Sequence, residues 1–182
     1  EVLGQVKDEM VIRSKIPHYP HIGSYSSPFT AWIGSVLLEA SNADVVSFHL
    51  DNPYPSIYPG DFRKKDIYRN YQYAGGEISV YRIQGWQLKR YMEWSAAYFN
   101  RIHPGDVTIS IQPKRARRKY STYDFFSGIQ YTIDLNQPVG QRIVEFTYDD
   151  GEEIKDQDLL NLGTNSYRMK ALLSANGVLA GE

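Results

Sequence analysis

Residues 86–102 read WQLKRYMEWSAAYFNRI and form the strongest helical pattern in the chain. Apolar and small side chains recur there every three or four positions, so they share one face of a helix. This face holds Leu88, Tyr91, Met92, Ser95, Ala96 and Phe99. After the helix the hydrophobic pattern becomes alternating, as in strands. The predicted strands are VTISIQ (107–112), GIQYTIDL (128–135) and RIVEFTY (142–148), with turns at NQPVG and DDGEE.

The chain before this helix contains a second helix and two strands. Ser27 is a typical N-cap and Pro28 a typical first helical residue, and apolar residues at helical spacing follow them. They predict a helix over about 28–42. ADVVSFHL (43–50) and EISVYRIQ (77–84) predict strands, with a short helix over Arg63–Asn70 between them.

The C-terminal part begins with a last predicted strand, LLNLGT (159–164). A polar turn over residues 163–166 is expected to end it, and the tail from Met169 is expected to be partly helical. Helices early in the chain and strands mostly late, joined by turns of hairpin length, predict an α+β fold. We expect a mixed β-sheet with two main helices, in preference to a doubly wound parallel sheet.

The domain organisation predicted from the sequence is simple. Residues 1–24 are read as a connector, because Pro17 and Pro20 in IPHYPHIG (16–23) bias their neighbours toward extended conformations. Residues 25–182 are expected to form one domain. A domain of this size buries a sizeable core without disulfides or metal ions.

Composition excludes several classes of function. Twenty basic and twenty-one acidic side chains leave a formal charge of −1, so no overall field attracts nucleic acid or an anionic membrane. The chain has no cysteine, which excludes disulfides, thiolate metal sites and cysteine nucleophiles. No apolar run reaches the roughly 20 residues that cross a bilayer, and EVLGQVKDEM lacks the pattern of a signal peptide. Fifteen tyrosines stand out, since amphipathic rings serve binding faces as well as cores.

No segment carries a catalytic pattern. The histidines His18, His21, His49 and His103 lack the His-Glu-x-x-His or Asp-x-His spacing of a metal site. There is no Gly-x-Ser-x-Gly elbow, and the glycine pair at 75–76 precedes a strand instead of opening a helix. We therefore expect no catalytic residue and no metal site in this chain.

The segment PKRARRKY (113–120) concentrates five cations. In a chain that is neutral overall, such a run is usually a solvated hairpin tip. The alternative is a single-stranded nucleic-acid binding module, in which the cations contact phosphates while Tyr120 and Tyr123 stack on bases.

Five segments resemble a known family, in the same order along the chain. They are ADVVSF, IYRNYQY, GWQLKRYMEWSAAYFN, YDFFSGIQYTIDLNQPVGQRI and NLGTNSYR. Over about residues 25–170 the chain resembles the C-terminal domain of bacterial 5′-nucleotidases and 2′,3′-cyclic-nucleotide 2′-phosphodiesterases. The tyrosine-bearing segments favour the cyclic phosphodiesterase branch. The resemblance implies the fold of that domain.

The resemblance also implies a division of labour. In that family an N-terminal metallophosphoesterase domain binds two divalent metal ions and performs hydrolysis, while the C-terminal domain holds the base and ribose. The metal-binding signatures Asp-x-His, Gly-Asn-His and Gly-His-x-His are absent from this chain. It is therefore expected to bind a nucleotide or nucleoside without cleaving it, as the partner of a metallophosphoesterase domain in the same full-length protein.

The family clamps the nucleobase between two aromatic rings, and the corresponding positions are Tyr73 and Tyr167. The resemblance places four further residues in the site: Ser127, Gly128, Asn165 and Arg168. The first two match backbone that meets the edge of the base. The last two flank the second ring and would reach ribose or phosphate.

The chain departs from the family pattern in two places. Where the 5′-nucleotidase branch has Asn-Gly-Gly-Gly-x-Arg, this chain has HLDNPY (49–54), so that branch's phosphate-contacting arginine is missing and His49 or Asn52 occupies the region. After the second ring the chain continues MKALLSANG where the family often has a glycine-rich stretch. Because the family works in the periplasm or at the cell surface, a periplasmic, cell-wall or secreted location is expected.

Overall fold

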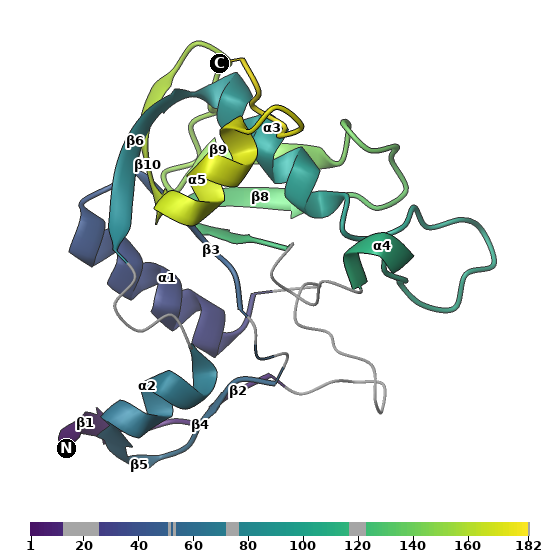
Figure 1. The fold of residues 1–182 in the computed structure, drawn as a ribbon. Coiled ribbons are helices and arrows are strands. Elements are labelled where there is room, and N and C mark those ends of the chain that lie inside the picture. Colours follow the sequence, from purple (N-terminus) through teal and green to yellow (C-terminus); the bar gives the residue numbers. More distant parts are fainter. Residues whose placement is uncertain (13–25, 51, 53, 72–76, 117–122, 182) are drawn as a thin grey trace.

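The main sheet of the protein has four strands. The computed structural model describes residues 1–12, 26–50, 52, 54–71, 77–116 and 123–181 (Figure 1). The strand order is β6 (Ile78–Gln84), β10 (Leu159–Asn165), β3 (Val45–Phe48) and β7 (Phe125–Ser127). β10 is parallel to β3, and the outer strands are antiparallel to their neighbours. This mixed sheet confirms the predicted α+β fold.

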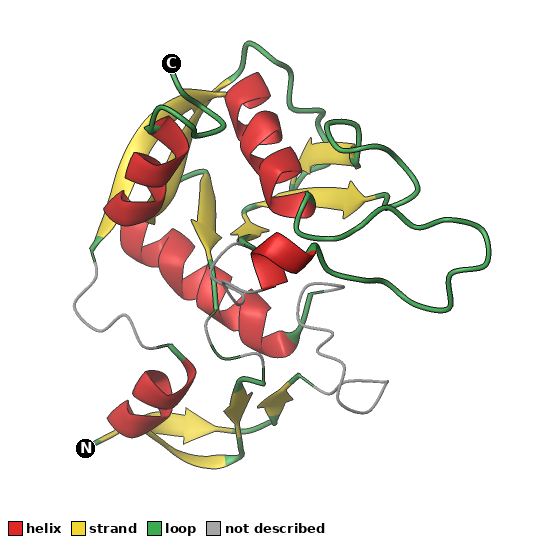
Figure 2. Cartoon of the chain, turned by 45° about the vertical axis from the view of Figure 1, so that its right-hand side comes forward, coloured by secondary structure: helices red, strands yellow, loops and turns green. Residues whose placement is uncertain are grey.

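Helices cover both faces of this sheet (Figures 1 and 2). α1 (Pro28–Ser41) lies on one face, whereas α3 (Gly85–Ala96), α5 (Ser166–Leu173) and the hairpin of β8 (Ile129–Ile133) and β9 (Ile143–Tyr148) pack on the other. Successive strand residues point to opposite faces, which gives the domain two apolar clusters. Val45 and Leu162 belong to the cluster of α3 and α5, and Phe48 belongs to that of α1.

The N-terminal residues pair with the segment between β3 and β6. β1 (Val2–Val6) pairs with β5 (Gly60–Arg63), and β2 (Met10–Val11) pairs with β4 (Ser56–Ile57). Part of the predicted connector is therefore β-structure. Residues 13–25, which include both of its prolines, lie outside the described residues, so the role of 1–24 as a linker stays a prediction.

Several elements begin where the sequence predicts. Ser27 caps α1 in a capping box: its Oγ accepts from the Thr30 amide at 3.2 Å, and its own amide donates to Thr30 Oγ1 at 2.9 Å. The predicted short helix is α2 (Lys64–Asn70), and the predicted strands over 77–84 and 142–148 are β6 and β9. Within the described part of the chain, no helix is long and apolar enough to cross a membrane.

α3 ends at Ala96, earlier than the periodicity predicts. The reason is Arg142, which is distant in sequence and 1% exposed. Its Nη1 donates to the carbonyls of Ala96 at 2.9 Å and Phe99 at 2.8 Å, which satisfies acceptors at the end of the helix. Phe99 then turns away and forms a β-bridge with Ile111.

The predicted strand over 107–112 is wrong. Only Ile111 forms a bridge, and Val107 is 98% exposed. Ile109 and Ile111 pack against the α1 cluster, which explains the alternating pattern. The Ser110 carbonyl accepts from the Asn100 amide, and the Gln112 amide donates to the Tyr98 carbonyl, on either side of the bridge. The basic segment is likewise no hairpin tip where it is described, because Pro113–Ala116 form the single turn α4.

Two strand boundaries also differ from the prediction. β10 continues through Asn165 and α5 begins at Ser166, so residues 163–166 are not a separate turn. The predicted strand over 128–135 starts earlier and is broken at Gly128, between β7 and β8. Gly128 has φ +92°, and a Cβ there would lie 2.3 Å from the Asp44 carbonyl oxygen, so both conformation and space require glycine.

Gly34 sets the distance between α1 and the sheet, and this leads to a prediction. A Cβ at Gly34 would lie 2.6 Å from Ser127 Cβ and 2.0 Å from its Oγ. Gly34→Ala should therefore lower the free energy of unfolding by about 1–3 kcal/mol, although alanine favours helices. Ser127→Gly in the same chain should recover part of the loss. Urea unfolding measures these changes in the free energy of unfolding, with Val36→Ala on the exposed side of α1 as control. A Gly34→Ala variant that is more stable than the original chain would contradict the close packing of α1 on Ser127.

Candidate functional site

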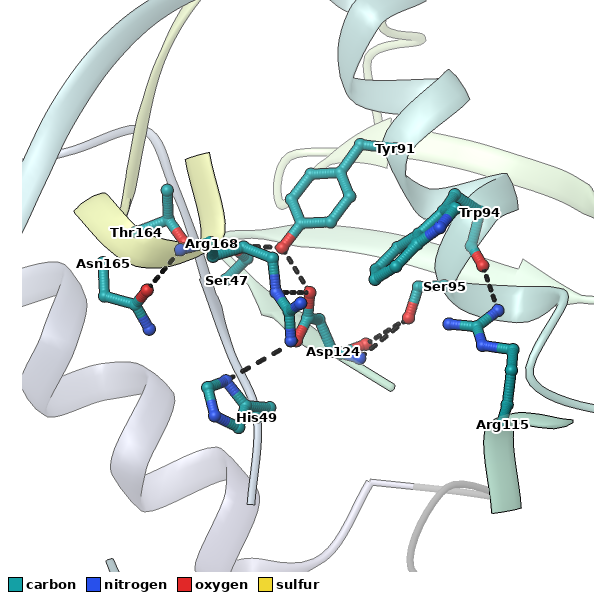
Figure 3. Close-up of polar contacts among 10 residues, drawn as sticks. All are labelled: Ser47, His49, Tyr91, Trp94, Ser95, Arg115, Asp124, Thr164, Asn165 and Arg168. Carbon is teal, nitrogen blue, oxygen red and sulfur yellow. Dashed lines mark hydrogen bonds and ion pairs between the residues drawn. The ribbon is translucent and has the colours of Figure 1, made fainter. Parts of the chain in front are cut away.

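The carboxyl ends of the parallel strands β3 and β10 lie at the same edge of the sheet. In open sheets that contain parallel strands, ligands bind at this edge. His49 follows β3, residues 166–168 follow β10, and Asp124 directly precedes the antiparallel strand β7. Segments far apart in the sequence therefore converge here, as Figure 3 shows for their side chains.

Asp124 is the centre of a buried polar cluster at this edge. Its side chain is 1% exposed. Arg168 makes a two-point contact with it, with Nε 2.7 Å from Oδ2 and Nη2 2.8 Å from Oδ1. The Tyr91 hydroxyl donates to Oδ2 at 2.5 Å, and His49 Nδ1 lies 3.8 Å from Oδ1. A carboxylate paired in this way remains stable inside the protein, because a cation and a hydrogen-bond donor replace water.

Neighbouring hydroxyls hold this cluster on both sides. Ser95 Oγ accepts from the Asp124 amide at 2.8 Å and bonds to its carbonyl at 3.0 Å. Ser47 Oγ donates to Thr164 Oγ1 at 2.9 Å and lies 3.1 Å from the Tyr91 hydroxyl. The cluster thus ties α3, β3 and β10 to the residue before β7.

The surroundings shift the pKa values of Tyr91 and Arg168 in this cluster. Burial raises the pKa of Tyr91 well above its ordinary value, and the charge of Asp124 adds to the effect, so the hydroxyl stays protonated and donates. Burial, the largest single effect, would lower the pKa of Arg168, but the charge of Asp124, the interaction with Tyr91 and the hydrogen bond to Asp124 together outweigh burial, and the pKa is raised. Arg168 therefore stays charged where it contacts Asp124.

Trp94 lies over the Arg168 guanidinium, with 5.2 Å from its ring centroid to Cζ. Arg115, from α4, lies 4.6 Å from the same ring and donates from Nη1 to the Trp94 carbonyl at 2.5 Å. Burial lowers the pKa of Arg115 to about 10, which still leaves it charged at neutral pH. One cation of the basic segment is therefore packed in the fold, and residues 117–122 lie outside the described residues.

The structure describes one of the two tyrosines of the predicted aromatic clamp. Tyr167 lies in the first turn of α5, and its side chain is 77% exposed. Asn165 caps this helix, with Oδ1 accepting from the Arg168 amide at 2.6 Å. Tyr73 lies outside the described residues. Ile78, a few residues after it, pairs with Asn165, so described neighbours of both tyrosines lie at one end of the sheet.

Arg168 and Asn165 both make contacts inside the protein. The guanidinium faces Asp124 through Nε and Nη2, and the Asn165 amide oxygen caps α5. The predicted contacts of these two side chains with ribose or phosphate stay predictions. The sequence analysis did not find the partner of Arg168, because Asp124 lies far away along the chain.

Ser127 and Gly128 lie beside α1. Ser127 pairs with Val46, on the level of Gly163 in β10, and its side chain faces Gly34 of α1. α5 packs on the opposite face of the sheet. Ser127 and Gly128 line a cleft of about 660 Å³ between α1 and β7–β8, where none of the described lining residues is charged. Tyr167 is not among the described lining residues of this cleft, and a joint site of the three residues stays a prediction.

The sequence analysis did not single out Asp124, and it placed Tyr91 only among the apolar residues of a helix face. An aspartate before an aromatic strand usually marks a solvated strand end, and a helical tyrosine usually packs in a core. The YDFF sequence at 123–126 was a signal only as part of the family resemblance. Among the residues that the structure describes, no three His, Asp or Glu side chains gather to hold a metal ion.

Comparison with known proteins decides the family. The model of the 5′-nucleotidase C-terminal domain matches residues 4–173. The chain belongs to this family. The chain is 26% identical over 129 residues to the trifunctional nucleotide phosphoesterase protein YfkN of Bacillus subtilis (strain 168). It is 32% identical over 107 residues to the 2′,3′-cyclic-nucleotide 2′-phosphodiesterase/3′-nucleotidase of Yersinia enterocolitica.

These relatives are much longer than this chain. The matches cover 64% and 50% of the chain but only 9% and 16% of the two relatives. Among solved structures, a Staphylococcus aureus protein in complex with alpha-ketoglutarate superposes with a TM-score of 0.72 at 26% identity, over 84% of this chain and 29% of its own. A Thermus thermophilus 5′-nucleotidase precursor, at 14% identity and a TM-score of 0.70, shows the same fold over 94% of this chain and 30% of its own.

Proposed function

We propose that this 5′-nucleotidase C-terminal domain is the nucleoside-binding part of a metal-dependent nucleotide phosphoesterase, with the base stacked between Tyr73 and Tyr167. The observation that carries the proposal is the exposed Tyr167 ring on the first turn of α5, at the carboxyl end of parallel strands. A large ring presented to solvent on an ordered helix is suited to stacking. Each base–aromatic contact contributes about 1–3 kcal/mol whatever the base.

The hydrolytic step belongs, in this proposal, to a metallophosphoesterase domain outside this chain, which holds two divalent metal ions. The activities after which the Bacillus and Yersinia relatives are named favour a substrate among nucleotides, and that of the Yersinia relative favours a 2′,3′-cyclic nucleotide. An exported location, in the periplasm, the cell wall or outside the cell, is part of the same proposal.

Salt dependence tests this function against nucleic-acid binding. NMR titration of the chain with adenosine should give a saturable response whose dissociation constant hardly changes with ionic strength, because stacking neutralises no phosphates. An oligonucleotide that bound through the basic segment would lose affinity steeply with salt. Tight, strongly salt-dependent oligonucleotide binding without adenosine binding would refute the proposed function.

A further inference from the structure

The position of the Tyr167 ring is determined by the backbone that carries it. Because the ring is 77% exposed, it has little packing of its own. The first turn of α5 is instead held at two points, the Asn165 cap on the Arg168 amide and the Arg168 guanidinium on Asp124.

Asp124 is itself fixed to α3. Ser95 bonds to both its amide and its carbonyl, and Tyr91 donates to its carboxylate. A continuous series of contacts therefore runs from α3 through Asp124 and Arg168 to the residue next to Tyr167 (Figure 3). Trp94, also on α3, lies over the guanidinium.

A buried ion pair contributes little net stability compared with a well-packed apolar pair, but its directional contacts select one geometry. We propose that Asp124 is a positioning residue, which acts through Arg168 to hold the first turn of α5 so that the Tyr167 ring faces the base. The inference rests on the proposed function and adds a determinant of affinity that does not touch the ligand.

The test replaces the ion pair by an apolar pair, Asp124→Leu with Arg168→Met. The double variant should fold with thermal stability close to that of the original chain, since no charge is left unpaired and Tyr91 keeps Ser47 as a neighbour. Adenosine should bind about threefold to tenfold more weakly, because ordering the turn now opposes binding.

In a Tyr167→Ala background the same pair of changes should cause no further loss of adenosine affinity. Amide hydrogen exchange should accelerate in the first turn of α5 but not in β10.

Two results would overturn the positioning role. One is a folded double variant that binds adenosine as tightly as the original chain. The other is a double variant that weakens adenosine binding by the same factor whether or not Tyr167 has been replaced by alanine. If the double variant fails to fold, Arg168→Lys replaces it, because lysine keeps the charge but cannot make the two-point contact. Arg168→Lys should weaken adenosine binding by less than the double variant does. This loss should again disappear in a Tyr167→Ala background. If adenosine does not bind the original chain at all, the proposed function fails, whereas hydrogen exchange still tests the anchoring of α5.

Discussion

Asp124→Leu alone is expected to lower the free energy of unfolding by about 3–5 kcal/mol. The change leaves the Arg168 guanidinium buried without its counter-charge and removes one of the two acceptors of the Tyr91 hydroxyl. The loss should largely disappear when Arg168→Met is added, because the uncompensated charge is then gone as well. Chemical denaturation of the two single variants and the double variant measures the coupling.

Asp149→Leu is the matched control for this prediction, since Asp149 is an exposed carboxylate in a turn. It should change the free energy of unfolding by no more than about 0.5 kcal/mol. Equal effects at the two aspartates would show that Asp124 is not the centre of a buried cluster. Additive losses for Asp124→Leu and Arg168→Met would show that the two side chains are not coupled.

Arg142→Met is the second change with a large expected effect. It removes the Arg142 donor from the carbonyls of Ala96 and Phe99, and the Ala96 carbonyl keeps the Phe99 amide at 3.2 Å. One unsatisfied buried acceptor costs roughly 1–3 kcal/mol, so the free energy of unfolding should fall by about 1–3 kcal/mol. Thermal unfolding followed by circular dichroism measures the change.

Arg101→Met provides the comparison for Arg142. Arg101 is exposed and donates to the Asn136 carbonyl at 2.7 Å, so its loss should change the free energy of unfolding by less than about 1 kcal/mol. A small effect at Arg142 would mean that water or another donor replaces its contacts, and the account of the early end of α3 would then fail.

The sequence predicted those elements whose causes are local. α1 was predictable because Ser27, Pro28 and the apolar spacing lie within one segment. The early end of α3 was not, because it depends on Arg142, far along the chain. The strand expected over 107–112 was wrong because an alternating pattern reports burial on one side and does not supply a partner strand.

In the candidate site, too, the sequence indicated what is local and missed what depends on distant residues. Tyr167 could be identified because an aromatic residue after a strand end matched the family resemblance, and the structure exposes it. The contact of Arg168 with Asp124 could not be predicted, because the two residues are 44 positions apart in the sequence. Ser127 and Gly128 line the cleft between α1 and β7–β8, which no local pattern indicated, and their place in one site with Tyr167 stays a prediction.

The clamp of Tyr73 and Tyr167 is tested most directly by measuring adenosine affinity and thermal stability on the same variants. Tyr→Phe at either site should be nearly silent, whereas Tyr→Ala should weaken binding by about 1–3 kcal/mol with little change in stability. The double alanine variant should lose less affinity than the sum of the single losses, because each ring covers one face of the same base. Alanine variants that bind adenosine normally, or that lose roughly 3–5 kcal/mol of stability as truncated core rings do, would contradict the account.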